Sequence, residues 1–269
     1  MSAVQQGSGT DRRQFLRRGA ATGAGMVAGV SSLGLLAPAF ATAKSGGVTS
    51  GDVAIVAAAQ IAEALAVTTY TNIINKAPFF KHLPTDDKGY LVGARQEEMS
   101  HYALEMSVTG KPSPFSTFYY PPKMFSDAAT TLDVLVTLED AFIAAYLVGV
   151  RNFSTPDLRV LAARIMGIES DHRTLARVLG GNVAHKDGGP IEKITGVQGK
   201  AESIDPPNNN GYERTLKWTK ISQAVDALTP FADKAAAAKA GFDTSKAYHF
   251  KPFTPKLPQA LGEFHSFAG

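Results

Sequence analysis

The sequence predicts an all-α protein built around a bundle of four long helices. Apolar residues recur at steps of three and four along four separate stretches, which is the spacing of one buried helix face. A segment rich in proline separates the second stretch from the third. Each predicted buried face also has acidic residues near its middle, where the core face of a helix normally has none.

Composition excludes several classes of site and partner. The chain has 269 residues, is 44% hydrophobic and contains no cysteine, which excludes disulfides, thiolate metal sites, cysteine nucleophiles and a lipoprotein anchor. Its net charge of +3 has a local origin, because residues 1–41 contain four arginines and one aspartate and the remainder balances at 23 basic and 23 acidic side chains. We therefore expect no nucleic-acid partner, since nucleic-acid binding needs a basic patch on the folded part.

Residues 1–41 resemble a twin-arginine (Tat) export signal that is cleaved after Ala41. Paired arginines at Arg12 and Arg13 precede a weakly hydrophobic stretch, and Ala39-Phe40-Ala41 has the small-x-small pattern of a cleavage site. The stretch is rich in glycine and too polar for a permanent membrane anchor. We expect the Tat export machinery as a partner and the periplasm or the cell exterior as the location.

The first two helices are predicted over residues 52–76 and 86–108. Ser50 or Asp52 is expected to cap the first, and Gly110 is expected to end the second. Their buried faces follow steps of three and four: Val53, Val56, Gln60, Glu63, Val67, Tyr70 and Ile74 in the first, and Leu91, Ala94, Glu98, His101, Glu105 and Val108 in the second.

Residues 109–125 predict a long crossover between the second and third helices. Four prolines exclude a helix, and a run of aromatic residues is too apolar for a free linker. At about 3.3 Å per residue the segment can extend roughly 50 Å, more than the length of one helix. It can therefore run along the bundle and join helices that are not antiparallel neighbours.

The third and fourth helices are predicted over residues 126–150 and 156–179. Ser126 is expected to cap the third, while Ser154-Thr155-Pro156-Asp157 is a strong start signal and Gly180-Gly181 a stop signal for the fourth. The buried faces are Leu132, Leu135, Glu139, Phe142, Tyr146 and Val150, and then Leu158, Leu161, Ile165, Glu169, His172, Leu175 and Leu179.

The chain after the bundle is predicted to form an extension over residues 181–269 that packs on the bundle domain of residues 50–180. Residues 182–211 are rich in glycine, proline and asparagine and are expected to be irregular. Residues 212–240 are predicted to be helical with a break or bend at Pro230. The end, from Tyr248, is expected to lie on the bundle surface.

The mid-helix polar residues form a repeated pattern that predicts a metal site. In chain order they are Glu63, Glu98-x-x-His101, Glu139 and Glu169-x-x-His172. Residues three apart share one helix face, and all six positions reach a similar height when the helices pack side by side. A lone Glu-x-x-His is typical of a solvent-exposed face, but this full set matches the ligands of dimetal sites in helix bundles.

Charge favours the same interpretation. Four buried carboxylates need compensation, and no lysine or arginine lies on the predicted faces, although Arg95, Arg164 and Arg173 are near their edges. Two divalent cations supply that charge, and oxygen and imidazole ligands without thiolate suit iron or manganese.

Other polar residues have less specific roles. Glu105 can be an outer carboxylate, an extra ligand or a surface residue. Tyr70 and Tyr146 are expected to be core tyrosines with satisfied hydroxyls, and Glu97 is expected to be solvent-exposed. The remaining histidines are predicted to lie on the surface: His82, His185, His249 and His265.

On these motifs, residues 53–180 resemble the ferritin-like superfamily. More narrowly, residues 115–122 (FSTFYYPP) and 135–142 (LVTLEDAF) are similar to exported ferritin-like proteins related to plant desiccation-related proteins. The resemblance implies a four-helix bundle with one long crossover. It also implies one metal ion on Glu63, Glu98 and His101 and a second on Glu139, Glu169 and His172, bridged by Glu98 and Glu169.

Two functions of different classes fit the sequence. One is an exported dimetal redox protein that acts on peroxide or dioxygen or oxidises Fe(II), so that its small-molecule partners are the oxidant and metal ions. The alternative is a non-enzymatic stress or desiccation-related protein in which metals only stabilise the bundle. The long C-terminal extension argues against a third option, a ferritin-type storage shell; a smaller homo-oligomer is compatible with each function.

Overall fold

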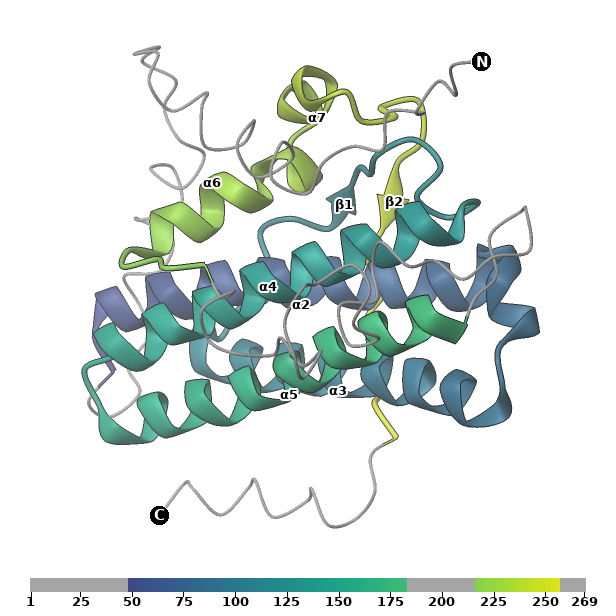
Figure 1. The fold of residues 1–269 in the computed structure, drawn as a ribbon. Coiled ribbons are helices and arrows are strands. Elements are labelled where there is room, and N and C mark those ends of the chain that lie inside the picture. The colour runs from purple at the N-terminus through teal and green to yellow at the C-terminus, as the bar shows by residue number, and fades with distance from the viewer. Residues whose placement is uncertain (1–47, 183–215, 257–269) are drawn as a thin grey trace, which may run out of the picture.

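A computed structural model of the chain describes residues 48–182 and 216–256. Its four long helices lie side by side as a bundle (Figure 1): α2 (Ser50–Lys76), α3 (Thr85–Thr109), α4 (Ala128–Asn152) and α5 (Pro156–Asn182). The shorter elements are the 3-10 helix η4 (Pro78–His82), helices α6 (Ile221–Ala232) and α7 (Lys234–Ala240), and the paired strands β1 (Thr117–Phe118) and β2 (Tyr248–His249). The predicted all-α four-helix bundle is confirmed.

Short connections pair α2 with α3 and α4 with α5. Hydrogen bonds between the two pairs show in which direction α2 runs relative to α4. Tyr70 on α2 bonds Glu139 on α4, whereas Glu63, earlier in α2, is bonded by Tyr146, later in α4. Because the later residue of α2 bonds the earlier residue of α4, the two helices are antiparallel. The contacts between α3 and α5 follow the same rule.

The crossover between α3 and α4 runs along α2, as its prolines predict. Gln60 Nε2 donates a 2.9 Å hydrogen bond to the Lys111 carbonyl, and further on the Tyr120 hydroxyl is hydrogen-bonded to Thr69 Oγ1 at 3.0 Å. The chain therefore advances toward the C-terminal end of α2 before it enters α4. The left-handed Gly110, at φ 68°, makes the turn out of α3.

The starts of α2 and α4 each differ from the sequence prediction by two residues, and their capping residues differ as well. Thr49, rather than Ser50 or Asp52, caps α2, and it does so in a capping box in which Asp52 is the reciprocal partner. Asp127, rather than Ser126, caps α4 by accepting a hydrogen bond from the backbone N–H three residues later. In both cases the cap is the side chain whose oxygen has the right reach to that N–H.

Predicted helix ends in the second half are also corrected. α5 continues through Gly180 and Gly181 to Asn182. Residues 216–220, predicted to be helical, are not, and α6 begins at Ile221; residues 212–215 lie outside the described residues. Pro230 lies inside the last turn of α6 and does not break it; the break comes at Asp233, whose side chain caps α7. A proline near a helix end removes few backbone bonds, so the new cap determines the boundary. The predicted export signal and most of the predicted irregular stretch lie outside the described residues.

The described part of the C-terminal extension covers the crossover and one side of the bundle. α6 lies across α2 and α4 (Figure 1), and β2 pairs antiparallel with β1. Tyr120 is the centre of an aromatic cluster, with ring centroids 4.9 Å from Phe125, 5.9 Å from Phe231 and 5.2 Å from Tyr248. These contacts hold the crossover between the bundle and the extension.

α2 packs against α3, α4 and α6. It is long and apolar enough to cross a membrane, but its apolar stretch is mostly buried against the other helices, as in the core helix of a globular protein. Two apolar clusters form the core, a large one and a smaller one that includes Val56, Tyr146 and Ile165.

Asp52 joins the start of α2 to the turn between α4 and α5, and its removal should destabilise the fold. Ser154 N–H donates to Asp52 Oδ1 at 2.8 Å, and Thr49 N–H donates to Oδ2 at 2.7 Å. Although burial raises the pKa of Asp52, the bonds from Ser154 and Thr49 lower it to about 2. The stability that this carboxylate contributes is therefore present above pH 3.8 and is lost as the pH falls toward 2.

We expect Asp52→Ala to lower the free energy of unfolding at neutral pH by roughly 1–3 kcal/mol. The control is Asp157→Ala, which removes an exposed acid from the first turn of α5 and should cost only about 0.3–1 kcal/mol. Urea titration measures both. Equal losses in the two variants would contradict the role given to Asp52.

Candidate metal centre

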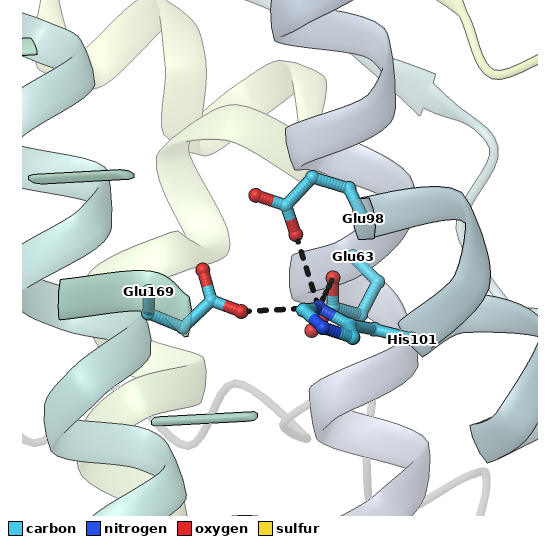
Figure 2. A group of neighbouring side chains, drawn as sticks. All are labelled: Glu63, Glu98, His101 and Glu169. Atoms are coloured by element: carbon cyan, nitrogen blue, oxygen red, sulfur yellow. Dashed lines mark ion pairs between the residues drawn. The ribbon is translucent and has the colours of Figure 1, made fainter. Parts of the chain in front are cut away.

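The six residues predicted from the repeated motif converge in the middle of the bundle. Glu63 comes from α2, Glu98 and His101 from α3, Glu139 from α4, and Glu169 and His172 from α5; all six are buried. They form two overlapping groups whose ligand atoms lie within 4.8 Å of one another: Glu63, Glu98, His101 and Glu169, and Glu98, Glu139, Glu169 and His172. Figure 2 shows the first group around the His101 ring.

Helix geometry explains why these residues meet. Glu98 and His101 are one turn apart on α3, and Glu169 and His172 have the same spacing on α5, so each pair points to one side of its helix. Because α3 and α5 are antiparallel, His101 lies beside Glu169 and His172 beside Glu98. The two carboxylates shared by both groups, Glu98 and Glu169, are the ones that the resemblance assigns as bridges.

The inward-facing atoms of these side chains lack hydrogen-bond partners. The buried atoms without a partner in the described structure include Glu63 Oε2, both oxygens of Glu98 and Glu169, Glu139 Oε2, and Nδ1 of His101 and His172. Some are close to one another: His172 Nδ1 is 2.9 Å from Glu98 Oε1, and His101 Nδ1 is 3.2 Å from Glu169 Oε1. These contacts do not have hydrogen-bond geometry. The atoms therefore lie close together without bonding one another, as the ligands of a common ion do.

Negative charge in the cluster is uncompensated by cationic side chains. Within the described residues, the four carboxylates have ion-pair contacts to the two histidines and none to lysine or arginine. Burying such charge without a partner costs several kcal/mol per group. Two divalent cations would supply the four missing positive charges, and the unpartnered oxygen and nitrogen atoms would be their ligands. The cluster can therefore hold metal ions.

Without metal, bound protons neutralise part of this negative charge. Burial, followed by repulsion from Glu98 and Glu169, raises the pKa of both Glu63 and Glu139 well above the ordinary value. Burial lowers the pKa of the histidines, but Glu63 beside His101 and Glu98 beside His172 more than offset it and raise both. Burial raises the pKa of Glu98 as well, yet its two histidine neighbours bring it below the ordinary value.

Two tyrosines hold the carboxylates that are not shared between the groups. The Tyr70 hydroxyl on α2 donates to Glu139 Oε1 on α4 at 2.7 Å, and the Tyr146 hydroxyl on α4 is hydrogen-bonded to Glu63 Oε1 on α2. Each tyrosine thus fixes the glutamate of the opposite helix and leaves that glutamate's second oxygen facing the cluster. The prediction of core tyrosines with satisfied hydroxyls is confirmed.

Glu105 reaches the cluster through Tyr146 and belongs to neither ligand group. It is buried, and its Oε1 lies 2.7 Å from the Tyr146 hydroxyl. That hydroxyl has one proton but contacts both Glu63 and Glu105, so the second contact requires a proton on one of the two carboxyl groups. Burial raises the pKa of Glu105 well above its ordinary value, which agrees with a shared proton at this position.

Glu97 was predicted to be solvent-exposed, and this prediction is wrong. Its side chain is 34% exposed, and His172 Nε2 donates a 2.8 Å hydrogen bond to its Oε2. The hydrogen bond from His172 lowers the pKa of Glu97, and it orients the ring so that Nδ1 faces the cluster. Periodicity within α3 places Glu97 off the buried stripe, and only the position of α5 shows that it faces a second helix. At the equivalent position of α5 stands Ile168, so His101 has no such partner among the described residues.

Asp140 and Arg173 are a second feature that periodicity did not predict. Arg173 Nη1 donates to Asp140 Oδ1 at 2.6 Å, and both side chains are buried. Each residue directly follows a cluster residue, Glu139 or His172, so the pair ties α4 to α5 beside the cluster. The other histidines do not approach it: His82 and His249 are exposed as predicted, and His185 and His265 lie outside the described residues.

The family described as the ferritin-like domain matches residues 51–182, which include all six cluster residues. No curated protein matches the chain.

The pKa directions predict that the metal-free protein loses stability as the pH rises. The folded chain holds protons on groups with raised pKa that the unfolded chain releases, so their contribution is complete below pH 4.5 and declines above it. The histidines extend this decline beyond pH 6.5, whereas the lowered pKa of Glu98 matters only below pH 4.5.

After chelation we therefore expect the melting temperature to fall between about pH 5 and pH 8, by about 2–4 °C for each kcal/mol lost. Circular dichroism at constant ionic strength measures the change. The double variant Glu63→Gln/Glu139→Gln, which lacks two titrating groups, should show a flatter dependence. A wild-type melting temperature that rises with pH would contradict the assignment.

Proposed function

Residues 51–182 belong to the ferritin-like domain family, and from that premise we propose that the buried cluster is a dimetal redox centre. Iron and manganese are the metals that we propose, because the donor atoms are carboxylate oxygens and imidazole nitrogens without thiolate. The reaction that we propose is the consumption of dioxygen or peroxide or the oxidation of Fe(II).

The observation that supports this proposal is the set of unpartnered, converging ligand atoms. A polar network that served packing alone would satisfy its buried carboxylates with hydrogen bonds. Here both oxygens of Glu98 and of Glu169 lack such partners at the centre of the bundle. Bound iron or manganese would supply adjacent centres that change oxidation state and polarise an O–O bond.

The surrounding side chains prepare the cluster for such ions. Tyr70 and Tyr146 each occupy one oxygen of a terminal glutamate and leave the other free. Glu97 fixes the ring orientation of His172. Asp140 and Arg173 neutralise each other beside the cluster and add no net charge to it. The site is therefore preorganised while its own negative charge remains available to cations.

We further propose that the protein is exported before it acts. The paired arginines and the Ala39-Phe40-Ala41 pattern support a cleaved Tat signal. Mass spectrometry of the natural protein should then give an N-terminus at Thr42, and replacement of Arg12 and Arg13 by lysine should retain the uncleaved chain inside the cell. A mature protein that begins near Met1 would contradict export by this route.

The ligand arrangement predicts how variants lose metal. Purified protein loaded with Fe(II) or Mn(II) should contain about two ions per chain. Glu98→Gln should lower the occupancy of both positions, because Glu98 belongs to both groups, whereas Glu63→Gln should weaken mainly one. Elemental analysis and titration calorimetry measure the stoichiometry, and mixing with dioxygen, peroxide or excess Fe(II) measures turnover.

Glu97 provides a matched test of the surrounding structure. Glu97→Gln should weaken the position that contains His172 by about 10–100-fold, while Asp171→Asn, an exposed acid next to His172, should leave both affinities unchanged. Metal uptake without any turnover would contradict the redox proposal and leave a metal site that only stabilises the bundle. Fewer than one ion per chain would refute the metal centre itself.

A further inference from the structure

Charge is segregated between the bundle and the described part of the C-terminal extension, although their totals almost cancel. Residues 48–182 contain 11 basic and 14 acidic side chains, whereas residues 216–256 contain seven lysines, no arginine and three aspartates. All seven lysines are exposed. Two of the aspartates have local roles, because Asp233 caps α7 and Asp243 accepts hydrogen bonds from Ser245. The extension therefore gives the molecule a positively charged side.

Five exposed lysines lie on segments that meet at the C-terminal end of α2. Lys76 Nζ, in the last turn of α2, lies 4.6 Å from the centroid of the Tyr248 ring on β2. The crossover joins the same region, because Asp243 N–H donates to the Tyr120 carbonyl at 2.9 Å. Figure 1 shows α7 projecting away from the four long helices above these contacts. We call this region the basic lobe, with the members Lys76, Lys123, Lys234, Lys239 and Lys246.

One member of the basic lobe has an unusual backbone conformation. Lys123 has a left-handed φ of 68°, and it is the one non-glycine residue with a positive φ in the described ranges. Glycine or asparagine adopts this conformation with less strain than lysine. The Lys123 side chain is exposed, so packing does not require a lysine here. Backbone strain is typical of positions with a function, and the property that this side chain adds to the surface is its charge.

The chemistry of the basic lobe fits a diffuse negative surface. Lysine has a compact charge on a flexible stem and lacks the planar fork with which arginine binds one phosphate in two places. The lobe also projects from the molecule (Figure 1), whereas proteins that bind single-stranded nucleic acid use a charged groove along the strand. A cluster of about four to eight basic side chains is the size that anionic membrane surfaces attract.

We propose that the basic lobe binds the protein reversibly to membrane surfaces that contain anionic phospholipids. Lysines on α7 and in the segment before β2 meet the headgroups, together with Lys76 and Lys123 from the end of α2 and the crossover. Electrostatic attraction without an inserted chain is reversible. In this orientation the side of the bundle formed by α3 and α5, where Glu97 bonds His172, faces away from the membrane. The inference does not depend on the metal centre.

Flotation of the natural protein with lipid vesicles tests this proposal without any metal. Vesicles of equal parts phosphatidylglycerol and phosphatidylcholine should bind the protein at low ionic strength, and high salt should release it because it screens exposed charges. Vesicles of phosphatidylcholine alone should not bind it. Equal binding to both kinds of vesicle, or binding to neither, would overturn the proposal.

Lys123→Asn separates membrane binding from folding. Asparagine tolerates the left-handed backbone and is uncharged, so this variant should bind anionic vesicles roughly fivefold more weakly, with a melting temperature that is unchanged or higher. The double variant Lys123→Asn/Lys239→Gln should bind roughly 25-fold more weakly. Its matched control is Arg151→Gln/Lys217→Gln, which removes two exposed charges near the opposite end of α4 and should change binding by less than about twofold.

The variants and a second polyanion determine what the lobe recognises. An equal loss of binding in the double variant and in its control would show that net charge alone attracts the protein, and it would overturn the basic lobe. Tighter binding to a short single-stranded DNA than to anionic vesicles, at the same ionic strength, would overturn the assignment to lipid.

Discussion

Uncompensated negative charge at the centre of the bundle is the constraint on which the rest of this structure depends. Four carboxylates share a region with two imidazoles and no lysine or arginine partner among the described residues. A protein interior tolerates this only when protons or cations neutralise it. The raised pKa values of Glu63, Glu139 and both histidines show neutralisation by protons, and bound cations would neutralise the same charge in its place. Metal binding at this cluster would therefore be coupled to the stability of the metal-free protein.

Packing around the cluster fixes the positions of its ligand residues. α2 contributes a single glutamate, and most of its other buried residues are apolar, so packing largely determines its position in the core. The crossover and the C-terminal helices hold α2 against α4 through Tyr120 and its aromatic neighbours. This packing keeps the ligand atoms from moving into hydrogen bonds with each other, so that they stay in position to bind an ion.

The sequence predicted the bundle and the six cluster residues because both depend on spacing within single helices. A step of three or four gives the buried face, and a glutamate three residues before a histidine gives two groups on it. The contacts that the sequence did not predict depend on how neighbouring helices lie relative to one another. Glu97 is off its own stripe and meets His172 only because α5 lies beside it. Asp140 and Arg173 pair across two helices in the same way. The caps were predicted at the wrong residues, because the capping by Thr49 and Asp127 depends on side-chain reach at one end of a helix, which periodicity does not measure.

The crossed tyrosine bonds give the molecule the character of a dimer within one chain. Tyr70 and Tyr146 occupy equivalent positions, and each bonds the glutamate of the other helix pair. Reciprocal contacts of this kind are those of an isologous interface between two identical subunits. A single α-hairpin would lack the tyrosine for its own glutamate, one of the four residues of one ligand group and three of the four of the other. The crossover thus replaces a concentration-dependent association with a covalent link. Covalently linked halves can differ in sequence, and these do: Glu105 in the first half corresponds to Ala176 in the second, and Glu97 corresponds to Ile168.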